Sequence, residues 1–190
     1  MSSSVLIVGA GAGLSASLAR LFQHEGMKVT LAARNIEKFK SIEVNGATLH
    51  QTDATDPDQV QKLFSHLDNT LGTPELVIYN PSARIRGPIS ELDPIATKAA
   101  IEITCFGAFL VAQQAAKRMI IKGSGSIFFT GASAGVKGFA NSSVFAMGKF
   151  GLRGLAQALA RELHPKNIHI GHFVIDGGIQ SETRPDDGSN

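Results

Sequence analysis

Cysteine is nearly absent from this chain, because only Cys105 among its 190 residues carries a thiol. A single cysteine excludes an internal disulfide and is typical of a protein in a reducing compartment. An excess of one charge is also missing: 18 Lys and Arg residues face 16 Asp and Glu residues, which gives a formal net charge of +2. This balance offers no electrostatic attraction for nucleic acid or for an anionic membrane surface.

A long hydrophobic run near the N-terminus is missing as well. The first residues, Met-Ser-Ser-Ser, lack basic side chains, and the apolar run at 5–8 is too short for a signal peptide or a membrane span. We therefore expect a cytoplasmic protein with no membrane segment. Length and an apolar content of 43% fit one globular domain at residues 1–180, followed by a polar tail at 181–190. The six histidines show no metal-ligand spacing with carboxylates or with Cys105, so no metal site is expected.

Glycine, in contrast, is concentrated in a turn close to the N-terminus. The aliphatic run 5–8 is typical of a buried parallel strand, and residues 14–23 carry apolar side chains at helical spacing. Between them lie Gly9, Gly11 and Gly13, which leave room for a phosphate beside backbone N–H groups. The pattern predicts an anion site at a helix N-terminus. The alternative is a strand-to-helix turn that needs glycine only for a positive φ.

The rest of the chain alternates short apolar runs with longer amphipathic ones. Strands are expected at 5–8, 28–33, 47–51, 76–79, 125–130 and 168–175, and helices at 14–23, 36–42, 57–71, 94–121 and 142–163. Alternating strands and helices favour an α/β fold of the Rossmann type, a doubly wound parallel sheet with helices on both faces. A ligand crevice is then expected at the carboxyl ends of the strands.

Five segments in order resemble the short-chain dehydrogenase/reductase family. They are Gly9–Ser15, Asp53, Tyr79–Ser82, Thr130–Gly135 and Phe145–Lys149, and the resemblance covers essentially the whole chain. It implies the strand order 3-2-1-4-5-6, a nicotinamide dinucleotide, and hydride transfer to or from a carbonyl or alcohol carbon. The family continues with a substrate-covering segment and a seventh strand, for which this chain shows no counterpart.

The resemblance also implies where the dinucleotide is held. Gly9 and Gly13 stand at two of the family's three glycine positions, and Ser15 stands at the third. Ala33 occupies the position of the acidic residue that binds the ribose of NAD, and Arg34 follows it. A guanidinium without a competing carboxylate suits the 2′-phosphate of NADP, so NADP is preferred over NAD. The alternative is that Arg34 is a solvated loop residue.

By the same resemblance, Asp53 contacts the adenine edge and Asn80 the neighbouring ribose. Without a ligand, the aspartate is explained as a helix cap and the asparagine as a turn former. The other expected cofactor contacts are Gly11, Leu14, Ala54, Lys149, Gly177 and Ile179.

The catalytic half of the pattern departs from the family. Lys149 is kept, but Phe145 stands at the tyrosine position, Ala132 at the serine position, with Ser133 next to it, and Thr104 at the asparagine position. A phenyl ring has no proton to give, so the usual mechanism cannot run.

Two interpretations remain open. In the first, the chain is an oxidoreductase that uses Lys149 and Ser133 and takes its proton from another group. The further proton donors considered are Tyr79, Ser142, Ser143, His172 and Asp176, each of which also has a purely structural explanation. In the second, the chain is an inactive dinucleotide-responsive binding or scaffold subunit.

Self-association is expected from the two long helices. Their apolar stripes, which include Phe106, Phe109 and Phe150, are broader than one core face requires. The family commonly pairs these helices across a two-fold axis, so a homodimer or homotetramer through helices 94–121 and 142–163 is predicted. The alternative is that the sheet covers the stripes. The three phenylalanines Phe128, Phe129 and Phe173 are expected in the core.

Overall fold

A six-stranded parallel sheet forms the centre of the computed structural model, which describes residues 3–37, 46–177 and 179. The strands are β1 (Ser4–Val8), β2 (Lys28–Ala33), β3 (Thr48–Gln51), β4 (Leu76–Tyr79), β5 (Gly125–Ala132) and β6 (Ile168–Ile175). Their order is β3-β2-β1-β4-β5-β6, and every neighbouring pair is parallel. The predicted fold class and strand order are therefore confirmed.

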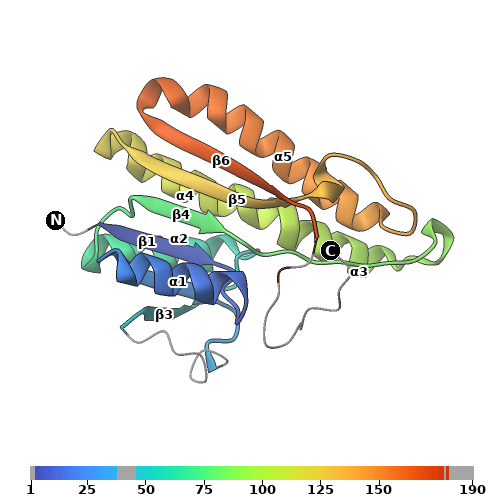
Figure 1. Ribbon diagram of the computed structural model, residues 1–190, viewed down its shortest axis with the longest axis horizontal. Coiled ribbons are helices and arrows are strands. Elements are labelled where there is room, and N and C mark those ends of the chain that lie inside the picture. The colour runs from blue at the N-terminus through green and yellow to red at the C-terminus, as the bar shows by residue number, and fades with distance from the viewer. Residues whose placement is uncertain (1–2, 38–45, 178, 180–190) are drawn as a thin grey trace.

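Helices cover both faces of this sheet (Figure 1). They are α1 (Leu14–His24), α2 (Pro57–Thr70), α3 (Pro94–Ile101), α4 (Gly107–Lys122) and α5 (Ser143–Leu163). A π-helical turn, Glu102–Phe106, joins α3 to α4, so the helix expected at 94–121 is one run with a bulge in it. The helix expected at 36–42 falls largely outside the described residues, and the tail expected at 181–190 falls outside them entirely.

Two hydrophobic clusters fill the space between the layers. On one face, α1 packs through Ala19 on side chains of β1, β2 and β4, such as Ile7, Leu31 and Ile78. On the other face, α2, α4 and α5 pack on the opposite side chains of the same strands and of β5, such as Phe129. Central strands buried on both faces need apolar residues at every position, which is why runs such as Leu76–Tyr79 show no alternation.

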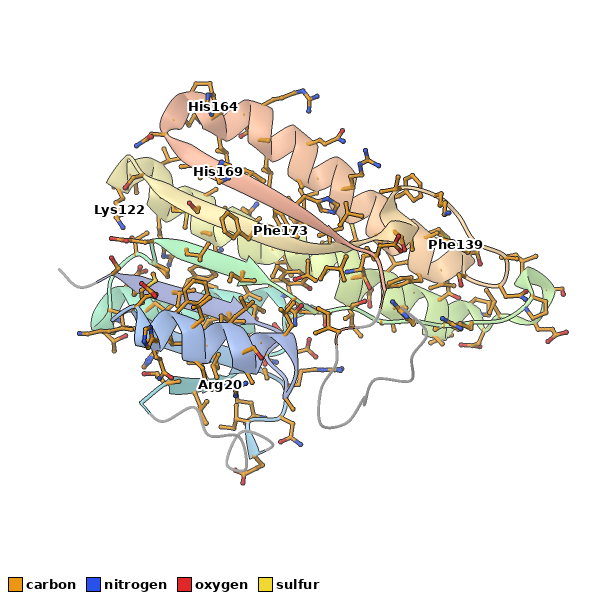
Figure 2. The ribbon with its side chains drawn as sticks, in the orientation of Figure 1. Arg20, Lys122, Phe139, His164, His169 and Phe173 are labelled. Carbon is orange, nitrogen blue, oxygen red and sulfur yellow. The ribbon has the colours of Figure 1, made fainter. Side chains whose placement is uncertain are left out.

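The outermost strand, β6, carries one correction to the sequence analysis. Phe173 is 54% exposed and does not belong to the core, whereas Phe129 is buried as expected and Phe128 is partly buried. Phe128 and Phe173 pack edge to face with ring centroids 5.2 Å apart. Figure 2 shows Phe173 and His169 on the near face of β6, where no helix of the described residues lies over them.

One helical run, Pro94–Lys122, is long and apolar enough to cross a membrane by length and composition alone. Its buried side chains, including Val111, Ala115 and Met119, pack into the core beneath the sheet. Packing against the sheet accounts for part of the apolar composition of this run, because 39% of its most apolar window is buried.

Candidate active site and dinucleotide pocket

The glycine turn after β1 has a backbone that only glycine fits. Gly9 has φ +75°, and its N–H donates to the Ala32 carbonyl at 2.9 Å. A Cβ atom on Gly9 would lie 2.4 Å from a ring carbon of Pro81. Helix α1 begins after Gly13 with no side-chain cap and no acidic residue in its first turn. The helix N-terminus therefore faces the turn without a carboxylate that would compete with a bound anion.

Ser15, at the position where the family has its third glycine, is buried and hydrogen-bonded. Its hydroxyl accepts from the Asn80 side-chain amide at 2.8 Å and lies 3.5 Å from the Gly9 carbonyl, to which it donates. The backbone N–H of Asn80 donates to the Val8 carbonyl at 3.0 Å. Asn80 thus ties the end of β4 to the glycine turn, a role that the sequence did not reveal.

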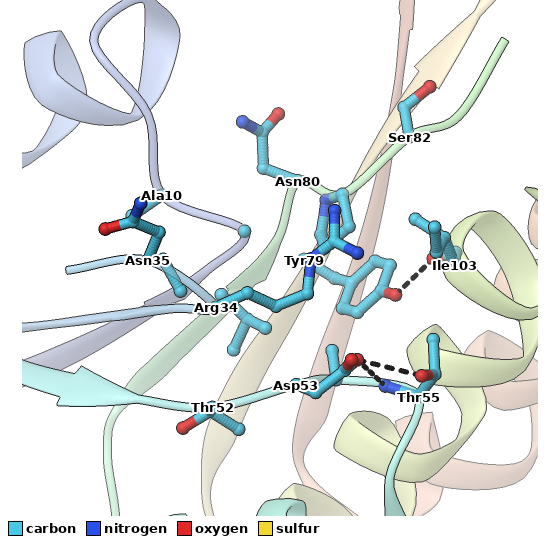
Figure 3. A pocket seen from close by; sticks show the side chains of 15 residues that line it. Ala10, Arg34, Asn35, Thr52, Asp53, Thr55, Tyr79, Asn80, Ser82 and Ile103 are labelled. Atoms are coloured by element: carbon cyan, nitrogen blue, oxygen red, sulfur yellow. Dashed lines mark hydrogen bonds between the residues drawn. The ribbon is translucent and has the colours of Figure 1, made fainter. Parts of the chain in front are cut away.

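A cavity of about 390 Å³ opens at the carboxyl ends of β1, β2 and β4. Five of the predicted cofactor residues line it, namely Gly9, Arg34, Asp53, Ala54 and Asn80. Figure 3 shows the Arg34 side chain lying across this cavity, with its guanidinium in front of Tyr79 and Asn80. The Arg34 side chain is exposed to solvent and also lines the pocket.

The carboxylate of Asp53 is anchored within the pocket wall. Its Oδ1 accepts from the backbone N–H and the hydroxyl of Thr55, at 2.9 and 2.8 Å (Figure 3). The helix cap of α2 is Asp56, which accepts from the N–H groups of Asp58 and Gln59. The structural alternative for Asp53, a helix cap, is therefore wrong.

The catalytic positions of the sequence pattern lie on β5 and α5. Ala132 and Phe145, which the resemblance placed at the serine and tyrosine positions, form a small buried apolar cluster with Ala134. Thr104 is buried in the π-helical turn, and its hydroxyl accepts from the Ala83 N–H at 3.1 Å.

Lys149 is only 2% exposed, so it is not a surface lysine. Its Nζ donates to the Thr130 carbonyl at 2.6 Å and lies 5.8 Å from the centre of the Phe145 ring. Burial, and then the neighbouring Arg84 charge, lower the pKa of Lys149 from 10.5 to about 8. An ammonium group with that pKa loses its proton far more readily than an ordinary lysine does.

The sequence profile of the family described as short chain dehydrogenase matches residues 3–188. The chain belongs to the short-chain dehydrogenase family. A short-chain dehydrogenase from Rhodopseudomonas palustris is 36% identical, with a TM-score of 0.85, and the match covers 92% of this chain and 85% of that one.

Solved structures of similar fold hold both forms of the family's cofactor. An actinorhodin polyketide ketoreductase solved with NADPH is 23% identical, with a TM-score of 0.86 over 90% of this chain and 69% of that one. A xylitol dehydrogenase bound to NAD⁺ is also 23% identical, with a TM-score of 0.87 over 92% and 70%. The family uses NAD or NADP, and this chain is an oxidoreductase of that family.

The residues of the pocket fit such a dinucleotide. The uncapped N-terminus of α1 suits a diphosphate, and the cavity beside it has the size and the polar groups that an adenosine half requires. Of the other predicted contacts, Gly11, Gly13 and Leu14 form the turn next to this cavity. The cavity is not lined by Lys149, Gly177 or Ile179. Lys149 lies on α5, which follows β5, and the other two residues follow β6, on the other half of the sheet.

The other proposed proton donors of this short-chain dehydrogenase are placed less favourably. Tyr79 is fully buried and donates to the Ile103 carbonyl at 2.5 Å, and burial raises the pKa of its hydroxyl. Ser142 is the N-cap residue of α5 but makes no side-chain cap bond. Ser143 lines a separate cavity of about 410 Å³ between α3 and α5. Asp176 is exposed at the end of β6.

His172 and Ser133 remain close to the end of the sheet. The Nε2 atom of His172 is buried and has no hydrogen-bond partner among the described residues. Burial, followed by the charges of Arg153 and Lys149, lowers the pKa of His172. β5 ends at Ala132, two residues beyond its predicted end. Ser133 therefore begins the turn that follows the strand, and it is half-buried.

Sequence reasoning missed Arg84. The centre of its guanidinium lies 4.2 Å above the Phe145 ring, and its charge acts on Lys149. An arginine in a polar segment gives no local signal of such a contact, because the ring it covers is 61 residues away in the chain.

Proposed function

We propose that this chain is an NADP(H)-dependent oxidoreductase with a non-standard active site, acting on a small carbonyl or activated double-bond compound. The observation that carries the proposal is the burial of Lys149 beside Phe145, with its ammonium group on the Thr130 carbonyl. Burial of a charged lysine costs stability, and ionisable groups buried in this way occur often at functional sites. By the resemblance to the family, Lys149 stands at the position of the catalytic lysine.

Arg34 supports the preference for NADP. It follows β2 directly and lies across the pocket, and its neighbours in the chain, Ala33 and Asn35, carry no carboxylate. The carboxylate of the pocket wall, Asp53, accepts hydrogen bonds from Thr55. A guanidinium binds a phosphate through two parallel hydrogen bonds and is always charged. Arg34 would hold the 2′-phosphate, while the turn from Gly9 to Gly13 would hold the diphosphate.

This proposal departs from the sequence-based expectation of a separate proton donor, because it takes Lys149 itself as the donor. A reduced dinucleotide held by the turn from Gly9 to Gly13 and by Arg34 would supply hydride chemistry at the substrate carbon. The Lys149 ammonium gives its proton to the substrate oxygen, and the neutral amine then takes a proton from solvent. Its pKa of about 8 is close to the working pH, as general acid catalysis requires. Ser133, at the end of β5, would hold the substrate oxygen.

A second function is favoured by the cluster of Ala132, Ala134 and Phe145. This cluster removes the hydroxyl groups that the family uses, and it leaves the dinucleotide pocket intact. The chain would then be an inactive binding or scaffold subunit that responds to the dinucleotide.

Two steps separate the two functions. The protein is first titrated with NADPH and with NADH while the cofactor fluorescence is measured. A panel of carbonyl and enone compounds is then added to the saturated complex. The reductase is expected to bind NADPH more tightly than NADH and to consume it with some compound. Lys149→Ala should abolish this consumption, whereas Lys98→Ala, an exposed lysine on α3, should not. Tight binding of NADPH without turnover of any compound supports the subunit instead.

Two further features belong to this proposal. We place the protein in the cytoplasm, because one cysteine and a nicotinamide cofactor suit a reducing compartment. We also expect a homodimer or homotetramer. Phe106, Phe109 and Phe150 are 42–44% exposed, so the sheet leaves this part of the apolar stripes uncovered.

A further inference from the structure

Ser15 is buried behind the glycine turn, and its side chain does not line the dinucleotide cavity. It is 1% exposed and belongs to the first turn of α1. Its hydroxyl accepts a hydrogen bond from the Asn80 amide at 2.8 Å and lies 3.5 Å from the Gly9 carbonyl oxygen, to which it donates. One hydroxyl group therefore joins the start of the turn, the start of the helix and the end of β4.

The segment that follows β4 contacts the same turn from the other side. The Asn80 N–H donates to the Val8 carbonyl at 3.0 Å. A Cβ atom on Gly9 would lie 2.4 Å from the Pro81 ring, so this ring packs directly on the Gly9 backbone. Asn80 stands at the rim of the cavity with its side chain directed away from Asp53 (Figure 3). These contacts fix the position of the turn relative to the sheet.

The turn holds several backbone N–H groups without partners. The N–H groups of Gly9 and Ala10 donate to the Ala32 carbonyl. The next five, at 11–15, make no hydrogen bond within the part of the chain that the structure describes. Free N–H groups at the start of a helix bind phosphate oxygens. How well they converge on one anion depends on the backbone of the turn, which the Ser15 hydroxyl holds in place.

We propose that Ser15 is a positioning residue of the dinucleotide site, whose hydroxyl holds these N–H groups in the arrangement that receives the diphosphate. The inference rests on the dinucleotide site of the proposed function and adds the residue that orders its turn. Ser15→Gly restores the glycine of the family pattern, but it leaves the Asn80 amide without its buried acceptor and gives the turn more conformations. Ordering the turn then costs part of the binding free energy.

The alternative is that a serine is simply tolerated in place of the third glycine. That alternative predicts equal or tighter dinucleotide binding after Ser15→Gly, because glycine lets the backbone approach a phosphate more closely. The two explanations therefore predict opposite effects of one substitution.

The experiment compares two ligands on each variant. In the proposed function NADPH contacts both the turn and Arg34, whereas adenosine 2′-monophosphate carries the 2′-phosphate but no diphosphate. Ser15→Gly and Ser15→Ala are each expected to weaken NADPH binding at least about fivefold, measured by cofactor fluorescence. Their affinity for adenosine 2′-monophosphate, measured by calorimetry, should equal that of the wild type.

Two controls separate positioning from folding. Ser17→Gly and Ser17→Ala change an exposed serine on the same helix, whose hydroxyl accepts from Arg20 at 3.2 Å, and they should leave both affinities unchanged. In an Asn80→Ala protein, Ser15→Ala should cause no further loss of NADPH affinity, because the hydroxyl then has no amide to hold. Urea unfolding of the nucleotide-free proteins shows whether each variant is folded.

A Ser15→Gly protein that binds NADPH as tightly as the wild type does, or that loses affinity for both ligands equally, overturns the inference. Turnover of NADPH by the wild type tests the reductase separately. Weaker binding by the Ser15 variants of a wild type without turnover supports the inference and rejects the reductase. NADH titrations are run alongside, and a wild-type protein that binds neither NADPH nor NADH rejects both proposals.

Discussion

The ammonium group of Lys149 is buried, lies 5.8 Å from the centre of the Phe145 ring, and donates a hydrogen bond to the Thr130 carbonyl. Burial and the Arg84 charge lower the pKa of Lys149 to about 8 in the folded protein, whereas a lysine in the unfolded chain keeps a value near 10.5. Below pH 8 both states hold the proton, and the folded state carries the full cost of the buried charge. Between pH 8 and about 10.5 the unfolded state binds more protons, so the contribution of Lys149 to stability rises with pH.

Replacing this lysine tests the sign of that effect. Lys149→Met fills a similar volume without a charge, and we expect it to raise the free energy of unfolding at pH 7 by about 2 kcal/mol. The gain should shrink as the pH is raised from 8 to 10, because the wild-type protein then loses the buried charge. Urea denaturation at four pH values measures this. Burial also raises the pKa of Cys105 and of Tyr79 in the folded protein, but both groups are present in both proteins and cancel in the difference.

The control is Lys98→Met, because Lys98 is 75% exposed on α3. Its stability curve should run parallel to that of the wild type across the pH range. Parallel curves for Lys149→Met as well would mean that Lys149 is an ordinary solvated lysine.

At the level of elements, the approach of α4 to the ends of β3 and β4 depends on one glycine. A Cβ atom at Gly107 would lie 2.4 Å from the Tyr79 hydroxyl and 2.8 Å from the Ala54 carbonyl oxygen. Tyr79 is fully buried and Ala54 lines the dinucleotide cavity, so neither group can move without disturbing the pocket. At Gly154, in α5, nothing lies within 4 Å of the equivalent atom.

These two helical glycines should respond in opposite directions to the same substitution. Alanine is favoured over glycine in a helix interior, so Gly154→Ala is expected to stabilise the protein by about 0.5–1 kcal/mol. Gly107→Ala gains the same helical preference but forces the helix away from Tyr79, and we expect a net destabilisation of about 1–3 kcal/mol. Thermal unfolding of both variants measures the difference. Stabilisation by Gly107→Ala would show that α4 does not approach β4 this closely.

At the scale of the whole molecule, the outer surface of α4 and α5 carries an apolar patch. Phe106 and Phe109 stack with ring centroids 6.1 Å apart, and Phe150 is 44% exposed on α5. Large aromatic side chains exposed together are more typical of a protein interface than of a solvated surface.

Charge placed in this patch should separate the subunits. Phe109→Asp and Phe150→Asp are each expected to shift the protein from an oligomer toward a monomer, because a carboxylate buried in an apolar interface is left unpaired. Sedimentation velocity at several protein concentrations gives the mass. The matched control is Leu21→Asp, which changes a 53% exposed leucine on α1, in the helical layer on the opposite side of the sheet. A monomeric wild-type protein would contradict the expectation.

Local chemistry was enough to predict most of the fold. Strands β2, β4 and β6 have the predicted bounds, and the other described strands and helices differ from prediction by a few residues. The π-helical turn was missed, because no pattern in Glu102–Phe106 distinguishes it from α-helix. The interpretation of Phe145 as the residue at the family's tyrosine position stays a prediction, which follows from one side chain at a fixed spacing from Lys149.

The sequence by itself determined the strand and helix order and the glycine turn, because these depend on neighbours along the chain. Only the tertiary structure decided that Lys149 is buried, that Arg84 covers Phe145 and that Asn80 binds Ser15. It also decided that Phe173 is exposed on the outermost strand. These contacts join segments far apart in the chain, and their burial and charge arise only when the sheet brings the segments together.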